Sequence, residues 1–163
     1  MKTFVTKEYL KLCTERIAKL QADLDRIRLD KKVAFEGDTN AWHDNFAYEN
    51  ATREEKLAED RLFQAVREVE IYYVFSDVVP NKPTVVGIYC WVKVREENIV
   101  NTEIRERTIG VVPVGGQDHK KALFSYNAPI VSPLMGAKVG EKRVVKIPLG
   151  TFRTEILDIQ KMR

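Results

Sequence analysis

The sequence has no long hydrophobic run and few cysteines or histidines, and these absences exclude several classes of protein. None of its apolar stretches approaches the roughly 18 residues that a membrane-spanning helix needs. The opening residues, MKTFVTK, contain no apolar signal core. Cys13 and Cys90 lie far apart, and His43 and His119 have no partner at the spacing of a zinc site. We therefore expect a reduced, cytoplasmic protein that binds neither a membrane nor zinc.

Familiar signatures of nucleotide-binding and hydrolytic enzymes are also absent. The sequence has no GxxxxGK[ST] phosphate loop, no GxGxxG turn and no GxSxG nucleophile elbow. Its 163 residues allow one compact domain or two small ones. Hydrophobic residues make up 44% of the sequence, which is too large a fraction for a disordered chain. What remains is a folded protein without a recognisable catalytic motif.

The net charge of +3 conceals two halves of opposite sign. Residues 1–77 carry 13 basic and 16 acidic side chains, a net charge of −3, whereas residues 78–163 carry 14 basic and 8 acidic ones, a net charge of +6. Eight of the acids fall within residues 36–60. Such a run is either the solvated face of a helix or a charged probe. The near-neutral total therefore does not argue against an association with nucleic acid.

The first half has the pattern of two paired helices. Apolar residues recur at spacings of three and four in two stretches, which are Leu10, Cys13, Ile17, Leu20, Leu24 and Ile27, and then Ala58, Leu62, Ala65, Val69 and Tyr72. This heptad spacing predicts coiled-coil helices. The turn-forming residues Gly37–Asn40 separate them, so the helices must pair antiparallel. Each arm of about 27 residues would span roughly 40 Å and hold the turn at a distal tip.

The second half has the pattern of a small β domain. The segment Val78–Pro83 breaks the helix and predicts a linker, so the domains are expected to be residues 1–77 and 78–163. Strands are expected at residues 85–94, 103–112, 142–147 and 152–159, and a short helix within residues 128–137. Short strands with hairpin turns favour an antiparallel sheet packed by one helix. The expected fold class is therefore α+β.

Two stretches of the sequence resemble the Gre-type (GreA/GreB) transcription elongation factors of bacterial RNA polymerase. Residues 124–141, FSYNAPIVSPLMGAKVGE, are similar to the family signature I-S-x-x-S-P-L-G-R-A-L-L-G-K-x-x-G-D. Gly37-Asp38 and Asp44-Asn45 resemble the family's G-D-x-x-E-N hairpin tip. The resemblance implies an FKBP-like fold for the second domain. It also implies a bacterial, cytoplasmic accessory factor, not an enzyme, and we expect a monomer.

The same resemblance implies a mechanism. The chain would bind RNA polymerase, insert its hairpin into the secondary channel and stimulate cleavage of backtracked RNA. Asp38 and Asp44 would help to hold the second Mg²⁺ of the polymerase active site, and the chain would need no cofactor of its own. Lys31 and Lys32, nearest the tip, are the candidate contacts to the 3′ end of the nascent RNA. The candidate residues for docking on the polymerase are Pro129, Ile130, Leu134, Met135 and Gly136.

The tip departs from the family pattern, which leaves the function open. Asp38 and Asp44 are six residues apart instead of three, and the second acid is Asp in place of the longer Glu. One alternative is a Gre-like regulator that occupies the channel and modulates or inhibits the polymerase without supporting cleavage. A plain coiled-coil adaptor and a prolyl isomerase or chaperone are further alternatives. An isomerase would need an aromatic-lined apolar pocket, for which the candidates are Tyr89, Trp91, Phe124, Tyr126 and Phe152.

Overall fold

The structure is a computed structural model of the 163-residue chain and describes residues 2–36, 46–76 and 79–162. The chain has an α+β fold of two compact units. One unit is built mainly from residues 10–72, and the other from residues 3–9 together with residues from 73 onward. The structure thus groups residues 3–9 and 73–76 with the β unit, whereas the sequence placed them in the hairpin domain.

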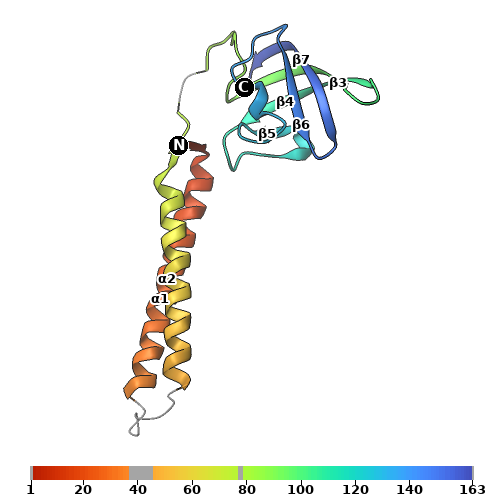
Figure 1. The fold of residues 1–163 in the computed structure, drawn as a ribbon. Helices are drawn as coiled ribbons and strands as arrows, with labels where there is room; N and C mark the ends of the chain where they lie inside the picture. Colours follow the sequence, from red (N-terminus) through yellow and green to blue (C-terminus); the bar gives the residue numbers. More distant parts are fainter. Residues whose placement is uncertain (1, 37–45, 77–78, 163) are drawn as a thin grey trace. The chain divides into compact units, whose positions relative to one another are not determined.

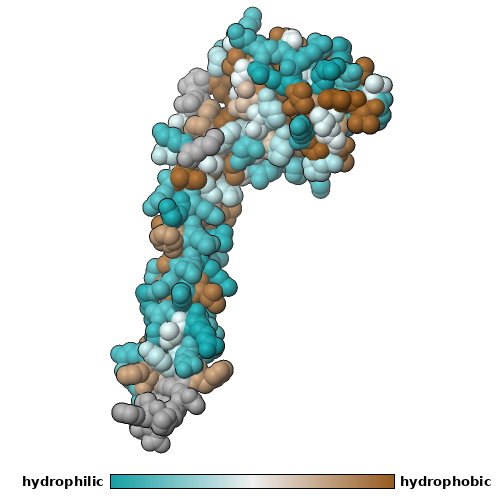
Figure 2. Space-filling view, in the orientation of Figure 1, coloured by the Kyte–Doolittle hydropathy of each residue, from teal (hydrophilic) through white to brown (hydrophobic). Residues whose placement is uncertain are grey.

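The first unit is formed by two antiparallel helices, α1 (Lys7–Glu36) and α2 (Phe46–Glu70), which lie side by side in Figure 1. The predicted seam lies between them. Leu24, Ala58 and Ala65 are buried, and the other predicted seam residues are half-buried. The face of the hairpin visible in Figure 2 is mostly hydrophilic. Neither of these described helices has the length and apolar character needed to cross a membrane.

The second unit is built around a five-stranded sheet with the strand order β5-β4-β3-β7-β6. Its strands are β3 (Cys90–Asn98), β4 (Ile104–Val112), β5 (Leu123–Ser125), β6 (Lys142–Ile147) and β7 (Gly150–Lys161). The β3–β4, β3–β7 and β6–β7 pairs are antiparallel, but β4 and β5 pair in parallel. The sheet is therefore mixed, and the expectation of a purely antiparallel sheet was wrong. The chain turns back through the 3-10 turn η1 (His119–Lys121) and enters β5 in the direction of β4.

Two further expectations for this unit need correction. Within residues 128–137 the structure has a single 3-10 turn, η2 (Ser132–Leu134), where a short helix was expected. Prolines at the start of this segment and within the turn interrupt the hydrogen-bond ladder that a helix needs. Strand β3 begins at Cys90, because Tyr89 adopts a left-handed φ of 61° that an extended strand cannot contain. The strand then continues to Asn98, beyond the expected end of this strand at residue 94.

The core of the second unit lies on one face of the sheet. Its buried members are Val86, Cys90, Val92, Val94, Ile109, Val111, Val131, Leu134, Ala137, Val145, Ile156 and Ile159. Two short strands outside the main sheet, β1 (Thr3–Val5) and β2 (Tyr72–Val74), pair with each other. The sequence did not predict them, because three residues are too few to show a strand periodicity.

Candidate functional site

The candidate site is the distal end of the hairpin, where α1 ends at Glu36 and α2 begins at Phe46. Asp38 and Asp44, which the sequence predicts to assist a polymerase metal, lie outside the described residues. Their role stays a prediction. Within the described ranges, no group of three or more His, Cys, Asp or Glu side chains could hold a metal ion.

A layer of charged residues joins the two helices near this end. Lys31 of α1 donates from Nζ to Oε2 of Glu55 on α2 at 2.7 Å. Arg28, one turn earlier on α1, donates from Nε to Oε1 of Glu55 at 3.0 Å and from Nη2 to Oε1 of Glu59 at 2.7 Å. Each of the two carboxylate oxygens of Glu55 therefore accepts a hydrogen bond from a cationic side chain of α1.

Lys31 and Glu55 stand at seam positions that a coiled coil normally fills with apolar side chains. Lys31 follows the seam residue Ile27 by four positions, and Glu55 precedes Ala58 by three. The side chains of Lys31 and Glu55 are accordingly only 25% and 17% exposed. A search for apolar residues alone misses this layer, whereas continuing the heptad register through charged positions would find it.

The charges of the layer stabilise one another. Hydrogen bonds from Lys31 and Arg28 hold the pKa of Glu55 below its ordinary value. The hydrogen bond to Glu55 in turn raises the pKa of Lys31, and the pKa of Arg28 is raised in the same way. The Lys31 ammonium also lies 5.3 Å from the centroid of the Tyr48 ring. The centroids of the Tyr48 and Phe35 rings are 5.8 Å apart. The two helices are thus also in contact beyond the layer, on the side nearer the end of α1 at Glu36.

The structure gives the two predicted RNA contacts different surroundings. Lys31 is held by Glu55 and would have to leave this partner to meet a phosphate. The side chain of Lys32 is 68% exposed, and its Nζ lies 3.7 Å from Glu36 Oε1 on the same helix. An exposed i,i+4 pair of this kind contributes little, so Lys32 can exchange it for another anion. Lys32 is therefore the more exposed and the more weakly paired of the two.

The five predicted docking residues lie on the loop that passes through η2. Leu134 is 1% exposed and belongs to the core, so it supports the loop from within. Ile130 and Met135 pack against the core and stay partly exposed, while Pro129 and Gly136 are exposed. Gly136 has a φ of +74°, a conformation that favours glycine. Pro129, Gly136 and the outer parts of Ile130 and Met135 are therefore on the surface of this loop, together with the exposed Ser132.

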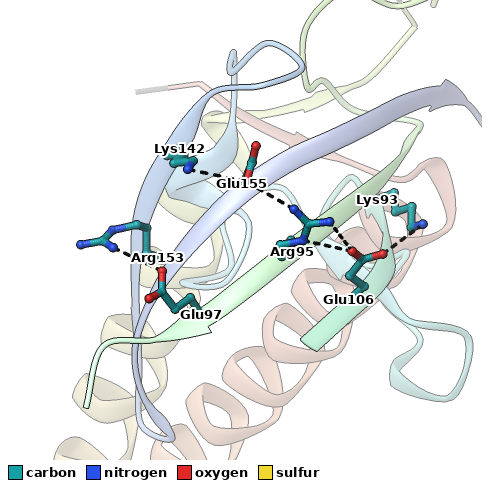
Figure 3. Close-up of polar contacts among 7 residues, drawn as sticks. All are labelled: Lys93, Arg95, Glu97, Glu106, Lys142, Arg153 and Glu155. Carbon is teal, nitrogen blue, oxygen red and sulfur yellow. Dashed lines mark hydrogen bonds and ion pairs between the residues drawn. The ribbon is translucent and has the colours of Figure 1, made fainter. Parts of the chain in front are cut away.

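Ion pairs cover the outer face of the sheet (Figure 3). Its charged residues are Lys93, Arg95, Glu97, Glu106, Lys142, Arg153 and Glu155, of which Glu97 and Arg153 form a separate pair and the other five are linked in a chain. Each of its three acids lies within 4.0 Å of at least one of its four bases. Because these charges compensate, the face offers a polyanion little excess of positive charge. The +6 of residues 78–163 is thus not concentrated there.

The inner face of the sheet carries a buried acid, Glu96, which is 2% exposed. It accepts hydrogen bonds from Arg105 Nε at 2.7 Å and from Arg107 Nη2 at 2.6 Å. Arg107 Nε and Thr154 Oγ1 are buried without a hydrogen-bond partner among the described residues. The Arg105 guanidinium lies 4.8 Å from the centroid of the Phe152 ring. The sequence did not indicate this cluster, because only the pairing of β3 with β4 and β7 brings its members together.

An apolar hollow of about 350 Å³ lies in the second unit, with walls that include Phe4, Phe75, Val79, Pro83 and Met135. The five aromatic residues considered for a prolyl isomerase are not among the described residues that line it. The aromatic walls of this hollow are instead Phe4 and Phe75.

Sequence comparison places the chain among known proteins. Residues 80–161 match the family described as "Transcription elongation factor, GreA/GreB, C-term". The transcription elongation factor GreA of Thermosipho africanus is 30% identical over 166 residues, which cover 94% of this chain and 98% of the relative. GreA of Streptococcus thermophilus is 32% identical over 121 residues, which cover 72% of this chain and 71% of the relative.

Solved structures of similar proteins were also found. GreA factor homolog 1 (Gfh1) of Thermus thermophilus aligns with a TM-score of 0.42 and 15% identity, covering 98% of this chain and 99% of that one. A GreA/GreB factor from Nitrosomonas europaea aligns with a TM-score of 0.39 and 20% identity over the same shares. These likenesses are too distant to carry an argument, so the assignment rests on the sequences. The chain belongs to the GreA/GreB family of transcription elongation factors.

Proposed function

We propose that this chain binds bacterial RNA polymerase, inserts its hairpin into the secondary channel and stimulates cleavage of backtracked RNA. The observation that carries the proposal is the long helical hairpin, in which α1 has 30 residues and α2 has 25. A 30-residue helix extends about 45 Å. The family's Gly-Asp and acid-Asn residues stand in the sequence between these two helices.

Asp38 and Asp44 supply the chemistry in this proposal. A carboxylate oxygen is the ligand that Mg²⁺ prefers, and a pair of such ions activates a water molecule and stabilises the leaving oxygen of an RNA strand. The chain would contribute ligands to the metal of the polymerase and would have no active site or cofactor of its own. Lys32 would contact the RNA 3′ end, and the surface of the η2 loop around Pro129 would dock on the polymerase.

The test is a stalled, backtracked polymerase complex with labelled RNA. Adding the protein should shorten the RNA faster than the polymerase does alone. Asp38→Asn and Asp44→Asn should abolish the stimulation while leaving binding to core polymerase intact, and Glu54→Gln, an exposed change on α2, serves as the control. RNA shortening at no more than the intrinsic rate would refute cleavage stimulation.

The sequence of the tip favours a second candidate, a regulator that occupies the channel without supporting cleavage. Its acids are six residues apart, and Asp44 is one methylene shorter than the Glu of the family pattern. The same assay separates the candidates, since such a regulator would bind the polymerase and change its elongation rate without shortening the RNA. Failure to retain core RNA polymerase in a pull-down would refute both.

A further inference from the structure

The charged layer at the distal end of the hairpin contrasts with the rest of the seam. At the remaining seam positions, from Leu10 to Ala34 on α1 and from Tyr48 to Tyr72 on α2, the described side chains are apolar or aromatic. A polar pair inside a coiled-coil seam lowers stability relative to an apolar pair, and its best-attested use is to specify the register of the helices. The position of Lys31 and Glu55 therefore points to a role in alignment.

The geometry of Glu55 accounts for such a role. Its two oxygens accept hydrogen bonds from Arg28 and from Lys31, which are three residues apart on α1. Sliding α2 along α1 by one helical turn, about 5.4 Å, would break both bonds at once. Glu55 therefore bonds both cations at the observed axial offset, at which Arg28 also donates to Glu59 at 2.7 Å.

We propose that Glu55 is a positioning residue that sets the axial offset of α1 and α2 at the distal end of the hairpin. It thereby determines which residues face each other where α1 ends at Glu36 and α2 begins at Phe46. Lys31 then acts through Glu55, not directly on RNA. For its consequence in transcription this inference rests on the proposed function, because Asp38 and Asp44 are carried between these two helix ends.

Contacts beyond the layer depend on the same offset. The centroid of the Tyr48 ring of α2 lies 5.3 Å from the Lys31 ammonium and 5.8 Å from the centroid of the Phe35 ring, and both partners lie on α1. The neighbouring acid Glu54, by contrast, is exposed and accepts a hydrogen bond from Asn50 of its own helix at 3.3 Å. Glu54 and Glu55 thus carry the same charge in adjacent positions, and Glu55 bonds across to α1.

The test compares alignment, stability and activity in the full-length protein. Spin labels attached through ketone-bearing residues at Val33 and Arg53, both exposed, report the distance between the helices and leave the native cysteines in place. The wild type and Glu54→Gln should give one narrow distance distribution. Glu55→Gln should broaden or shift it, whereas Glu55→Asp, which keeps the charge, should restore it in part.

The decisive variant is Lys31→Leu combined with Glu55→Leu. An apolar pair at these half-buried positions should keep or raise the melting temperature, since it continues the apolar seam and even a fully buried ion pair can often be replaced by well-packed apolar residues without loss of stability. The distance distribution should nevertheless broaden. The maximal rate of stimulated cleavage should fall by about tenfold or more, because misplacing a reacting group by 1 Å can cost about 100-fold. The concentration for half-maximal stimulation should stay the same.

The outcomes of this experiment are separable. A narrow, unshifted distribution in both Glu55→Gln and the double-leucine variant would overturn the positioning role, and a fall in cleavage without a change in distance would assign Lys31 directly to RNA. The distance measurement needs no polymerase. A wild type that stimulates no cleavage would therefore refute the proposed function alone, while a broadened distribution in the variants would still support the positioning role.

Discussion

Glu96→Gln should destabilise the β unit far more than Glu97→Gln, although the two residues are neighbours with the same charge. Glu96 lies on the inner face of β3, is 2% exposed and binds Arg105 and Arg107 at 2.7 and 2.6 Å. Glu97 lies on the outer face with its side chain 37% exposed, and meets Arg153 at 3.2 Å. Comparing the two substitutions therefore isolates the effect of burial on how much a carboxylate contributes to stability.

The magnitude follows from these exposures. Removing one partner of a buried ion pair costs about 3–5 kcal/mol, because the remaining charge is left without compensation. The side chains of Arg105 and Arg107 are 42% and 30% exposed, so water can replace part of what they lose, and glutamine still accepts one hydrogen bond. We therefore expect Glu96→Gln to lower the free energy of unfolding by about 2–3 kcal/mol, against about 0–1 kcal/mol for Glu97→Gln.

Urea denaturation followed by tryptophan fluorescence measures both values. The chain has two tryptophans, and a Trp42→Phe background leaves Trp91, which lies on β3, as the reporter for the β unit. The slope of the free energy against urea should stay constant, so that the shift in midpoint reflects stability alone. A Glu96→Gln variant within about 0.5 kcal/mol of the wild type, or no less stable than Glu97→Gln, would refute the reasoning.

Three further outcomes are expected. Gly115→Ala should destabilise the β unit by about 1–3 kcal/mol in the same assay, because the new Cβ at φ +91° would meet Tyr9 Cβ at less than van der Waals contact; an unchanged midpoint would contradict this. A thiol reagent at neutral pH should label Cys13 first and Cys90 only in denaturant, since burial raises the pKa of the Cys90 thiol; equal labelling rates would contradict the buried position. Hydrogen bonds from an arginine and a lysine of β3 lower the pKa of Glu106 below its ordinary value near 4.5. Its contribution to stability is therefore present at neutral pH and is lost as the pH falls through the lowered pKa, so Glu106→Gln should be less stable than the wild type at neutral pH and equal to it in strong acid.

The local patterns of the sequence were enough to predict much of the fold. The heptad spacing of the first half located both helices, because a helix and its buried stripe depend on residues three and four apart. Strands β6 and β7 were similarly visible as alternating or β-branched segments. The parallel β4–β5 pair was not, because its direction depends on the path of the chain through η1. The 3-10 turn η2 was mistaken for a helix although prolines in the segment already argued against one.

For the candidate site, too, the sequence predicted some features and only the tertiary structure decided others. The sequence by itself determined the family, the hairpin and the acids Asp38 and Asp44 as candidates, because these depend on short motifs and on spacing along one chain. Only the tertiary structure decided that Lys31 is bound to Glu55 and that Glu96 is buried, since both results depend on partners that are 24 and from 9 to 11 residues away along the chain. From the sequence alone a charged residue is expected to be solvated, because the sequence does not show which partner the fold brings beside it. Burying a charge without a partner costs free energy, so this pairing decides whether the residue can be buried.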